Sequence, residues 1–293
     1  MAAFETIICD AQSELSPAER RVARFFSDRK EIVLLGSAAE IAERAGASDA
    51  TVVRTARALG FESLSALRET LLSELTGSPT PGRRLKRTLD EAGDSAPHAL
   101  NHVVAVHEET LEVLKRPEFA AAFARAVAIL NGADRRYIFG IGPSGALAQY
   151  AALQFNRAGL ATATLSATGI ALADHLLWLN HGDAVLMIAY APVYREVAVV
   201  LQQARELEVP VVLVSDSLGP YVPDAVKEIL PVPRGRTDQL AMHGGTMVLI
   251  EALTTALAAG RRAGALANLE RLSALRGAID KTWLKRGVKP RRR

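Results

Sequence analysis

Hydrophobic positions recur at two different spacings along the 293-residue chain. Over residues 1–77 the spacing is helical throughout. Helix starts are marked by the N-cap serines Ser16, Ser37, Ser48 and Ser63, and Gly60 stands where a helix ends. The pattern therefore predicts an all-α N-terminal part with about five helices.

From residue 137 onward, short apolar runs alternate with helical patterns of about 10 to 15 residues. This alternation is typical of βαβ units, in which helices cover both faces of a parallel sheet. The sequence thus predicts an α/β fold class here, with a doubly wound parallel sheet. Further helices are expected at 85–130 and 264–280. The apolar runs, which we take as strands, cover residues 137–139, 162–165, 184–190, 211–214 and 228–232.

The segment GSPTPGRR at 77–84 is rich in glycine, proline and serine, as linkers are. It separates the purely helical rhythm from the rest, and the chain divides into four parts. We predict a helical domain at 1–77, a linker with connecting helices at 78–124, an α/β domain at 125–265, and a C-terminal helix with a basic tail at 266–293.

Composition excludes several classes of protein. Charged residues make up 23% and hydrophobic residues 49%, which is ordinary for a soluble globular protein. Cys9 is the single cysteine, so no internal disulfide or cysteine-rich zinc site can form, and its apolar neighbours predict a buried thiol. No signal-peptide pattern is present, and the longest apolar run has about ten residues where a membrane span needs about 20. We expect a cytoplasmic protein with no membrane partner.

The net charge of +3 comes from one end of the chain. Residues 281–293 carry seven basic residues and no acidic one, and without them the net charge is −4. The first 77 residues carry nine lysines and arginines against twelve acidic residues. A basic isoelectric point therefore gives no argument for nucleic acid, and any such argument depends on local geometry. The tail itself either contacts DNA phosphates or is a solvated run of charge.

Residues 38–57, AAEIAERAGASDATVVRTAR, meet three requirements of a helix-turn-helix. Ala42 is small where the second helix crosses the first. Gly46, four positions on, tolerates the positive φ of the turn. Val52, six positions further, supplies an apolar contact back to the first helix. Ile41, Ala45 and Leu59 are the remaining expected core positions.

In such a motif the second helix enters the major groove of double-stranded operator DNA by its N-terminal half. We expect its solvent face to present Ser48, Thr51, Arg54 and Arg57. Arginine pairs with guanine or holds a phosphate, and the N-terminal amides of the helix favour phosphate. Nearby acidic residues weaken non-specific binding to DNA, so we expect one helix-turn-helix to bind DNA with modest affinity. Tight binding to DNA is therefore expected to depend on dimerisation. The alternative is an ordinary helical bundle with exposed arginines.

The loop G-I-G-P-S-G at 140–145 follows a predicted strand and opens a helix. A dinucleotide site would need an acidic residue about 20 positions later, but none lies between Asp134 and Asp174. No cofactor is therefore predicted. The loop is still suited to an anion, which Gly142, Pro143, Ser144 and Gly145 would meet at the helix N-terminus. A tight turn without any ligand is the alternative.

Other clusters of chemical interest are incomplete. His98 and His102 share a helical face, but no acidic or cysteine partner completes a metal site nearby. Asp174 and His175 lack a nucleophile motif. We therefore predict neither catalytic residues nor metal ligands.

Residues 15–75 closely resemble the N-terminal domain of RpiR/MurR-family transcriptional regulators. The resemblance is carried by LSPAERRVA at 15–23, IAERAG at 41–46, and SDATVVR followed by LGF at 48–54 and 59–61. Family members often have a large apolar residue where this chain has Thr55. We expect this difference either to loosen one packing contact or to change how the helix recognises DNA locally.

The segment from about 125 to 262 resembles a SIS (sugar isomerase) domain, a doubly wound module that binds phosphosugars and usually dimerises. Ser144 falls on the first phosphate-loop serine of that family. The second ligand loop departs from the family pattern I-S-x-S-G-x-T-x-E-V, because this chain reads IAYAPVYREV at 188–197. Three hydroxyl donors are lost or displaced, and an unpaired buried phosphate would be costly.

Two outcomes of this departure are open. Tyr190 and Tyr194 could shape a more apolar or aromatic pocket for a different effector. Alternatively Arg195, Arg234 and Arg236 could supply the missing positive charge, with Asp238 beside them in the loop after the last predicted strand. Each of these loop residues could equally lie on the surface without a role. The effector site predicted from the sequence comprises Gly142, Pro143, Ser144, Gly145, Tyr190, Tyr194, Arg195 and Arg236.

The resemblance implies a DNA-binding regulator that senses a small effector, a sugar phosphate or related compound, and assembles as a homodimer or homotetramer. The effector would act on the DNA-binding part through the helices at about 78–130. Two alternatives remain: a sugar-phosphate isomerase, and a regulator whose α/β domain only dimerises.

Overall fold

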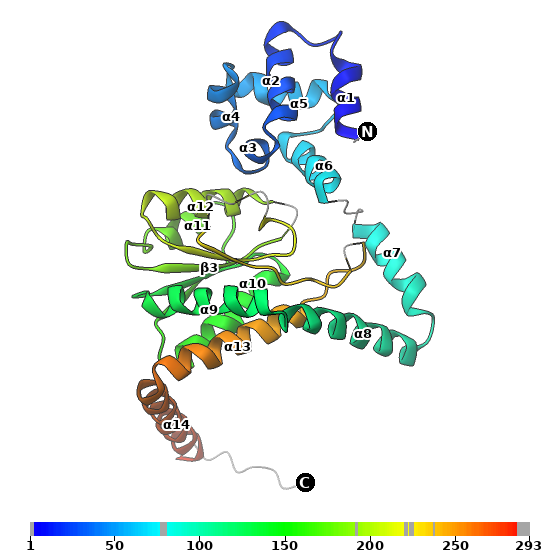
Figure 1. Ribbon diagram of the computed structural model, residues 1–293. Coiled ribbons are helices and arrows are strands. Elements are labelled where there is room, and N and C mark those ends of the chain that lie inside the picture. The colour runs from blue at the N-terminus through cyan, green and yellow to red at the C-terminus, as the bar shows by residue number, and fades with distance from the viewer. Residues whose placement is uncertain are drawn as a thin grey trace.

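The computed structural model describes residues 3–76, 81–190, 193–219, 222, 226–236 and 238–285 (Figure 1). Its N-terminal part is all helical, as predicted. The helices there are α1 (Ala3–Ala11), α2 (Pro17–Asp28), α3 (Lys30–Leu35), α4 (Ala38–Ala45), α5 (Asp49–Ala58) and α6 (Leu64–Thr76). The sequence pattern misses the short helix α3, because it follows α2 directly and its N-cap residue Arg29 makes no side-chain cap.

The predicted capping signals are confirmed. Ser16 and Glu19 form a reciprocal capping box at the start of α2. The other three serines each accept a hydrogen bond from the backbone N–H three residues later, at Glu40, Thr51 and Ala66. Gly60 follows α5 with a φ of 89°. Local capping chemistry therefore fixes where these helices begin and end.

The prediction that Cys9 is buried is wrong, since its side chain is exposed. Helix α1 turns Phe4 and Ile8, which lie one helical turn apart, into the core of the N-terminal part. Cys9 follows Ile8 by one position, so it lies about 100° around the helix and faces solvent.

The predicted linker at 77–84 is helical where the structure describes it. Residues 81–84 form the first turn of α7 (Pro81–Ala92), whereas 77–80 lie outside the described residues. Helix α7 packs against α8 (Ala96–Leu114), which is followed by α9 (Pro117–Gly132). The glycine and proline signal was misleading because Pro81 stands at the first position of a helix, where its missing N–H costs nothing.

The predicted parallel sheet is confirmed. It consists of β1 (Arg136–Phe139), β2 (Thr162–Leu165), β3 (Ala184–Ile188), β4 (Val211–Val214) and β5 (Glu228–Leu230). The strand order is β2-β1-β3-β4-β5 and every neighbouring pair is parallel. The intervening and following helices are α10 (Pro143–Arg157), α11 (Ile170–Leu176), α12 (Arg195–Glu206), α13 (Gly244–Gly260) and α14 (Arg262–Lys285).

Alternating strand residues feed two separate apolar cores, one on each face of the sheet. Ile138 and Leu186 pack with α9, α10 and α13. Tyr137, Phe139 and Met187 face the opposite side, where α11 and α12 lie (Figure 1). No helix in the part of the chain described by the structure is long and apolar enough to cross a membrane.

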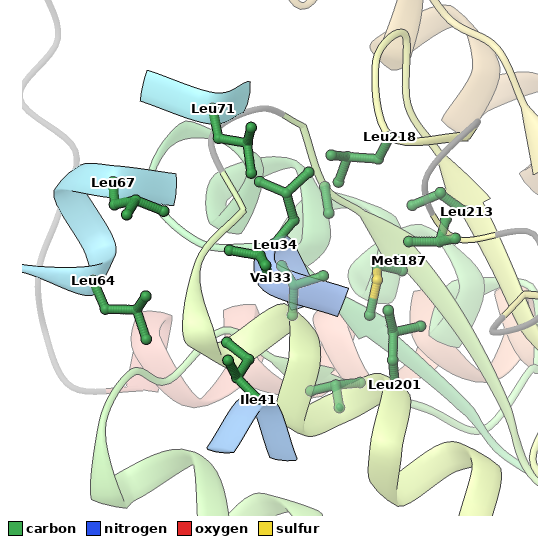
Figure 2. Packing of buried hydrophobic residues seen from close by; sticks show 14 of the residues in the cluster. Val33, Leu34, Ile41, Leu64, Leu67, Leu71, Met187, Leu201, Leu213 and Leu218 are labelled. Atoms are coloured by element: carbon green, nitrogen blue, oxygen red, sulfur yellow. The ribbon is translucent and has the colours of Figure 1, made fainter. Parts of the chain in front are cut away.

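The N-terminal helices rest on the α11–α12 side of the sheet domain (Figure 1). Helix α3 contacts α12, and the apolar residues of the two parts form one continuous buried cluster. Figure 2 shows Val33 and Leu34 of α3 in this cluster together with Met187 and Leu201. The N-terminal domain is thus packed directly against a helix of the sheet domain.

Candidate functional site

The helix-turn-helix core has the geometry that its sequence predicts. Gly46 adopts the left-handed conformation, with φ 63° and ψ 46°, and ends α4. Ala42 and Val52 are buried at the crossing of α4 with α5, as are Ile41 and Leu59. Ala45 is only partly buried and packs at the edge of this core.

Helix α5 presents Ser48, Arg54 and Arg57 to solvent. Thr51, which was expected on the same face, is buried with 6% of its surface exposed, so the expectation for its side chain is wrong. Its hydroxyl lies 2.9 Å from the Ser48 hydroxyl and accepts a hydrogen bond from Arg54 Nη2 at 3.4 Å. Thr51 therefore orients Arg54 from behind.

Thr55 is fully buried. Its hydroxyl donates to the backbone carbonyl of Thr51 at 2.8 Å. The polar atom is therefore satisfied within the helix, and it adds no group to the exposed face of α5.

A second candidate site lies where the strand order reverses. The chain runs outward from β1 to β2 and then crosses back to β3, so the loops after β1 and β3 separate at the carboxyl edge of the sheet. Open α/β sheets bind ligands at this topological switch point. The predicted loop 140–145 borders it, as do the described residues of the predicted loop 188–197, in which residues 191–192 lie outside the described part of the chain.

Four helices begin at this edge without a side-chain cap. They are α10 with N-cap Gly142, α11 with N-cap Gly169, α12 with N-cap Tyr194 and α13 with N-cap His243. Uncapped N-termini leave backbone N–H groups available and carry positive partial charge, which suits an anion. The Glu196 carboxylate in the first turn of α12 already occupies part of this edge, since it accepts a hydrogen bond from the Gly169 N–H at 3.2 Å.

The first loop needs its glycines for close backbone approach. Gly142 has φ 57°, and a side chain at Gly140 would collide with the carbonyl oxygen of Ser144. Ser144 is 8% exposed and lies in the first turn of α10. The loop thus folds as the sequence predicts, with Pro143, Ser144 and Gly145 opening the helix.

In the second loop, Tyr190 is buried rather than open to a pocket. Its hydroxyl lies 2.8 Å from the Thr246 hydroxyl, and its ring is covered by the Arg234 guanidinium, 3.9 Å from the ring centroid. Burial raises the pKa of Tyr190 to about 12, which its hydrogen bond to Thr246 partly counteracts. Tyr190 is therefore a neutral hydroxyl used inside the fold. Tyr194 is half exposed and Arg195 is exposed at the start of α12.

His243 packs edge-on against the Tyr190 ring, with the ring centroids 5.8 Å apart. Its Nδ1 atom is buried and has no hydrogen-bond partner among the described residues. Burial lowers the pKa of His243, as does the charge of Arg234, while Asp216 opposes the shift. The imidazole is therefore neutral at pH 7. The sequence pattern did not identify His243, because no motif surrounds it.

The candidate charges in the loop after β5 are already neutralised. Arg234 binds Asp216 through its backbone N–H and its guanidinium. Arg236 binds Glu91 of α7 and Glu109 of α8, each at 2.7 Å. Two further contacts tie the same loop to these helices: Asp238 pairs with Arg87, and Gln239 lies 3.2 Å from His102.

The idea that Arg236 supplies free charge to a ligand is therefore not what the structure shows. Its acidic partners come from connecting helices some 130 to 145 positions away in the chain. No local sequence signal places those helices on this loop. Among the described residues, no group of three or more histidine, cysteine, aspartate or glutamate side chains is placed to hold a metal ion.

Comparison with known proteins gives the same division. Residues 2–78 match the family described as helix-turn-helix domain, rpiR family, and residues 129–258 match the SIS domain family. A solved NanR protein of Vibrio vulnificus, complexed with ManNAc-6P, covers 93% of this chain and 98% of its own at 18% identity and a TM-score of 0.54. The sugar isomerase domain of an RpiR transcription factor from Sphaerobacter thermophilus covers 58% of this chain and 97% of its own, with a TM-score of 0.51 and 24% identity. These likenesses show the fold.

Among curated relatives, the bifunctional protein glk of Burkholderia orbicola is 28% identical over 249 residues, which is 85% of this chain. The chain spans only 37% of the length of that relative. An HTH-type transcriptional regulator of Caldanaerobacter subterraneus is 21% identical over 68% of this chain and 69% of its own length.

Fold, sites and comparisons define a two-part protein in which a helix-turn-helix domain precedes a SIS domain. Residues 2–78 belong to the rpiR family of helix-turn-helix domains, and residues 129–258 belong to the SIS domain family.

Proposed function

We propose that this protein regulates transcription by binding double-stranded operator DNA through α5. The observation that carries the proposal is the intact helix-turn-helix geometry, in which Arg54 and Arg57 project from α5 into solvent. Such motifs read the major groove mainly with the N-terminal half of the recognition helix, whereas Arg54 lies at the middle of α5 and Arg57 in its last turn.

The test uses duplexes from the region upstream of its own gene and random duplexes of equal length. Fluorescence anisotropy at moderate ionic strength gives the affinity for each. We expect the upstream duplex to bind at least tenfold more tightly. Equal affinities for both duplexes would contradict the proposal.

We propose further that the carboxyl edge of the sheet binds a small anionic effector of the sugar-phosphate class. The support is the uncapped helix N-termini at this edge, among them that of α10 with Ser144 in its first turn, together with the relative NanR, whose structure contains ManNAc-6P. The binding groups would be the backbone N–H groups of Gly142 and Ser144 and the Ser144 hydroxyl, with Tyr194 and Arg195 at the rim. Tyr190 and Arg236 support the loops rather than touch the effector.

The structure offers a direct route from this site to the DNA-binding domain. Helix α12 starts at the second ligand loop and contacts α3. Arg68 of α6 in turn donates hydrogen bonds to the carbonyls of Val33 and Gly36, at the end of α3. We propose that an effector held at the N-terminus of α12 changes the placement of α3, and with it α4 and α5. It can do so only if it binds the two placements with different affinity.

A second candidate is a SIS domain that binds no effector and only joins copies of the chain. It is favoured by the internal pairing of Tyr190, Arg234 and Arg236, which leaves these groups with nothing to offer a ligand. A thermal-shift screen across sugar phosphates, amino sugars, sugar acids and aromatic metabolites separates the two.

A shift with a phosphorylated sugar that is lost in Ser144→Ala, but kept in the surface control Ser13→Ala, supports the effector site. No shift with any class, with homo-oligomers intact, supports the second candidate. An isomerase would instead convert aldose to ketose phosphates in the same preparation, which we do not expect.

A further inference from the structure

A hollow of about 310 Å³ lies on the N-terminal domain between α2 and the end of α4. It is distinct from the exposed face of α5. Its lining is dominated by one residue type, and comprises Arg20, Arg21, Arg24, Phe25, Asp28, Arg29, Arg44 and Ala45. Such a concentration of guanidinium groups matches a ligand that carries phosphate.

The charge is concentrated here against the trend of the domain. The first 77 residues contain nine lysines and arginines, and five of them line this hollow beside a single acidic residue, Asp28. The domain as a whole carries more acidic than basic residues. Positive potential is therefore local to this surface, rather than spread over the domain.

Three of the five guanidinium groups have neither an ion pair nor a hydrogen bond among the described residues. Arg44 pairs with Glu40, and Arg21 is hydrogen-bonded to a backbone carbonyl. The exposed side chains of Arg20, Arg24 and Arg29 make no ion pair or hydrogen bond with any residue that the structure describes. Arg20 and Arg24 lie one helical turn apart on α2, so their guanidinium groups serve the same side of the helix.

The hollow borders the helix-turn-helix itself. Arg21 Nη2 donates to the carbonyl oxygen of Gly46, the turn residue, at 3.3 Å. Arg44 and Ala45 are the last residues of α4. At the N-terminal end of α2, hydrogen bonding with Ser16 is the main cause that lowers the pKa of Glu19, and the positive charge of Arg54 contributes to the same shift. Helix α2 therefore packs beside α5.

We infer that this hollow, which we call the α2 arginine cluster, binds backbone phosphates of the DNA that flank the groove entered by α5. The inference rests on the proposed function. Exposed charges hold a small free phosphate weakly, whereas DNA releases condensed counterions for each phosphate that is neutralised. The cluster gives affinity without sequence preference, and α5 supplies the preference.

The test is a salt titration of DNA binding with the double variant Arg20→Ala/Arg24→Ala. The control is Arg205→Ala/Arg262→Ala, which removes the same charge from exposed positions of the SIS domain. Two lost phosphate contacts reduce the slope of log K against log salt concentration by about 1.8. We expect that reduction for upstream and random duplexes alike, with their affinity ratio unchanged and the control equal to wild type.

A slope in the double variant equal to that of the control would overturn the inference. So would stabilisation of the wild type by millimolar inorganic phosphate that is lost in the double variant, if DNA affinity is unaffected. Since phosphate contacts are independent of sequence, random duplexes at low salt test the cluster by themselves. A wild type that binds random and upstream duplexes equally therefore contradicts the proposed function without deciding the role of the cluster.

Discussion

The Tyr190–Thr246 hydrogen bond tests whether the second loop is held by internal contacts. In Tyr190→Phe the ring and its stacking with Arg234 remain, but the partner of the Thr246 hydroxyl is removed. A neutral hydrogen bond contributes about 0.5–1.5 kcal/mol, and a buried group left unpaired costs about 1–3 kcal/mol. We expect Tyr190→Phe to lower the free energy of unfolding by about 1–3 kcal/mol.

The assay is a double-mutant cycle by urea unfolding at fixed protein concentration, with Thr246→Val as the second change. Each single variant leaves the remaining hydroxyl buried without a hydrogen-bond partner. The double variant should therefore be at least as stable as the less stable of the two single variants. A coupling energy of at least about 0.5 kcal/mol is therefore expected. Independent, additive losses would refute the reasoning. In the effector screen, Tyr190→Phe should retain the wild-type response.

The remaining predictions concern single positions. Gly46→Ala should cost about 1 kcal/mol of stability from its left-handed backbone alone, since nothing lies within 4 Å of the added carbon. Gly264→Ala, at a helical position that is also in open space, should instead raise the free energy of unfolding by about 0.5–1 kcal/mol. If urea unfolding showed that both substitutions change the free energy of unfolding in the same direction, the reasoning would be wrong. The lowered pKa of His243 means that the unfolded chain binds more protons, so stability present above about pH 6.5 is lost as pH falls through the folded-state pKa. His243→Gln should flatten that loss, and a profile matching wild type would contradict it. Exposed Cys9 should take up one equivalent of a thiol reagent in the native protein, and labelling only in urea would contradict its exposure.

The N-terminal domain could be predicted from sequence in detail because its determinants are local. Serine caps, the Ala42–Gly46–Val52 spacing and the stop at Gly60 each depend on contacts within a few residues, and the structure contains all of them. The failures in this domain have local causes too. Thr51 turns inward to hydrogen-bond with Ser48, and α3 lacks any capping signal.

The candidate site of the SIS domain could be predicted only in outline. The strand rhythm and the glycine loop placed Ser144 correctly, because both are properties of one βα unit. The fate of Arg236 depends on Glu91 and Glu109, and that of Tyr190 depends on Thr246. These partners come from distant parts of the chain. A side chain that the sequence suggests is available to bind a ligand is therefore already paired within the tertiary structure.

Reading of base pairs by α5 is most directly tested by measuring sequence preference in variants of its two exposed arginines. The affinity ratio between upstream and random duplexes should fall by about 1–3 kcal/mol in Arg54→Ala, and also in Arg57→Ala if it too reaches a base edge. The matched variant Arg205→Ala should keep the wild-type ratio. If the double variant Arg54→Ala/Arg57→Ala preserved the full preference while remaining folded, α5 would not be the element that reads the operator.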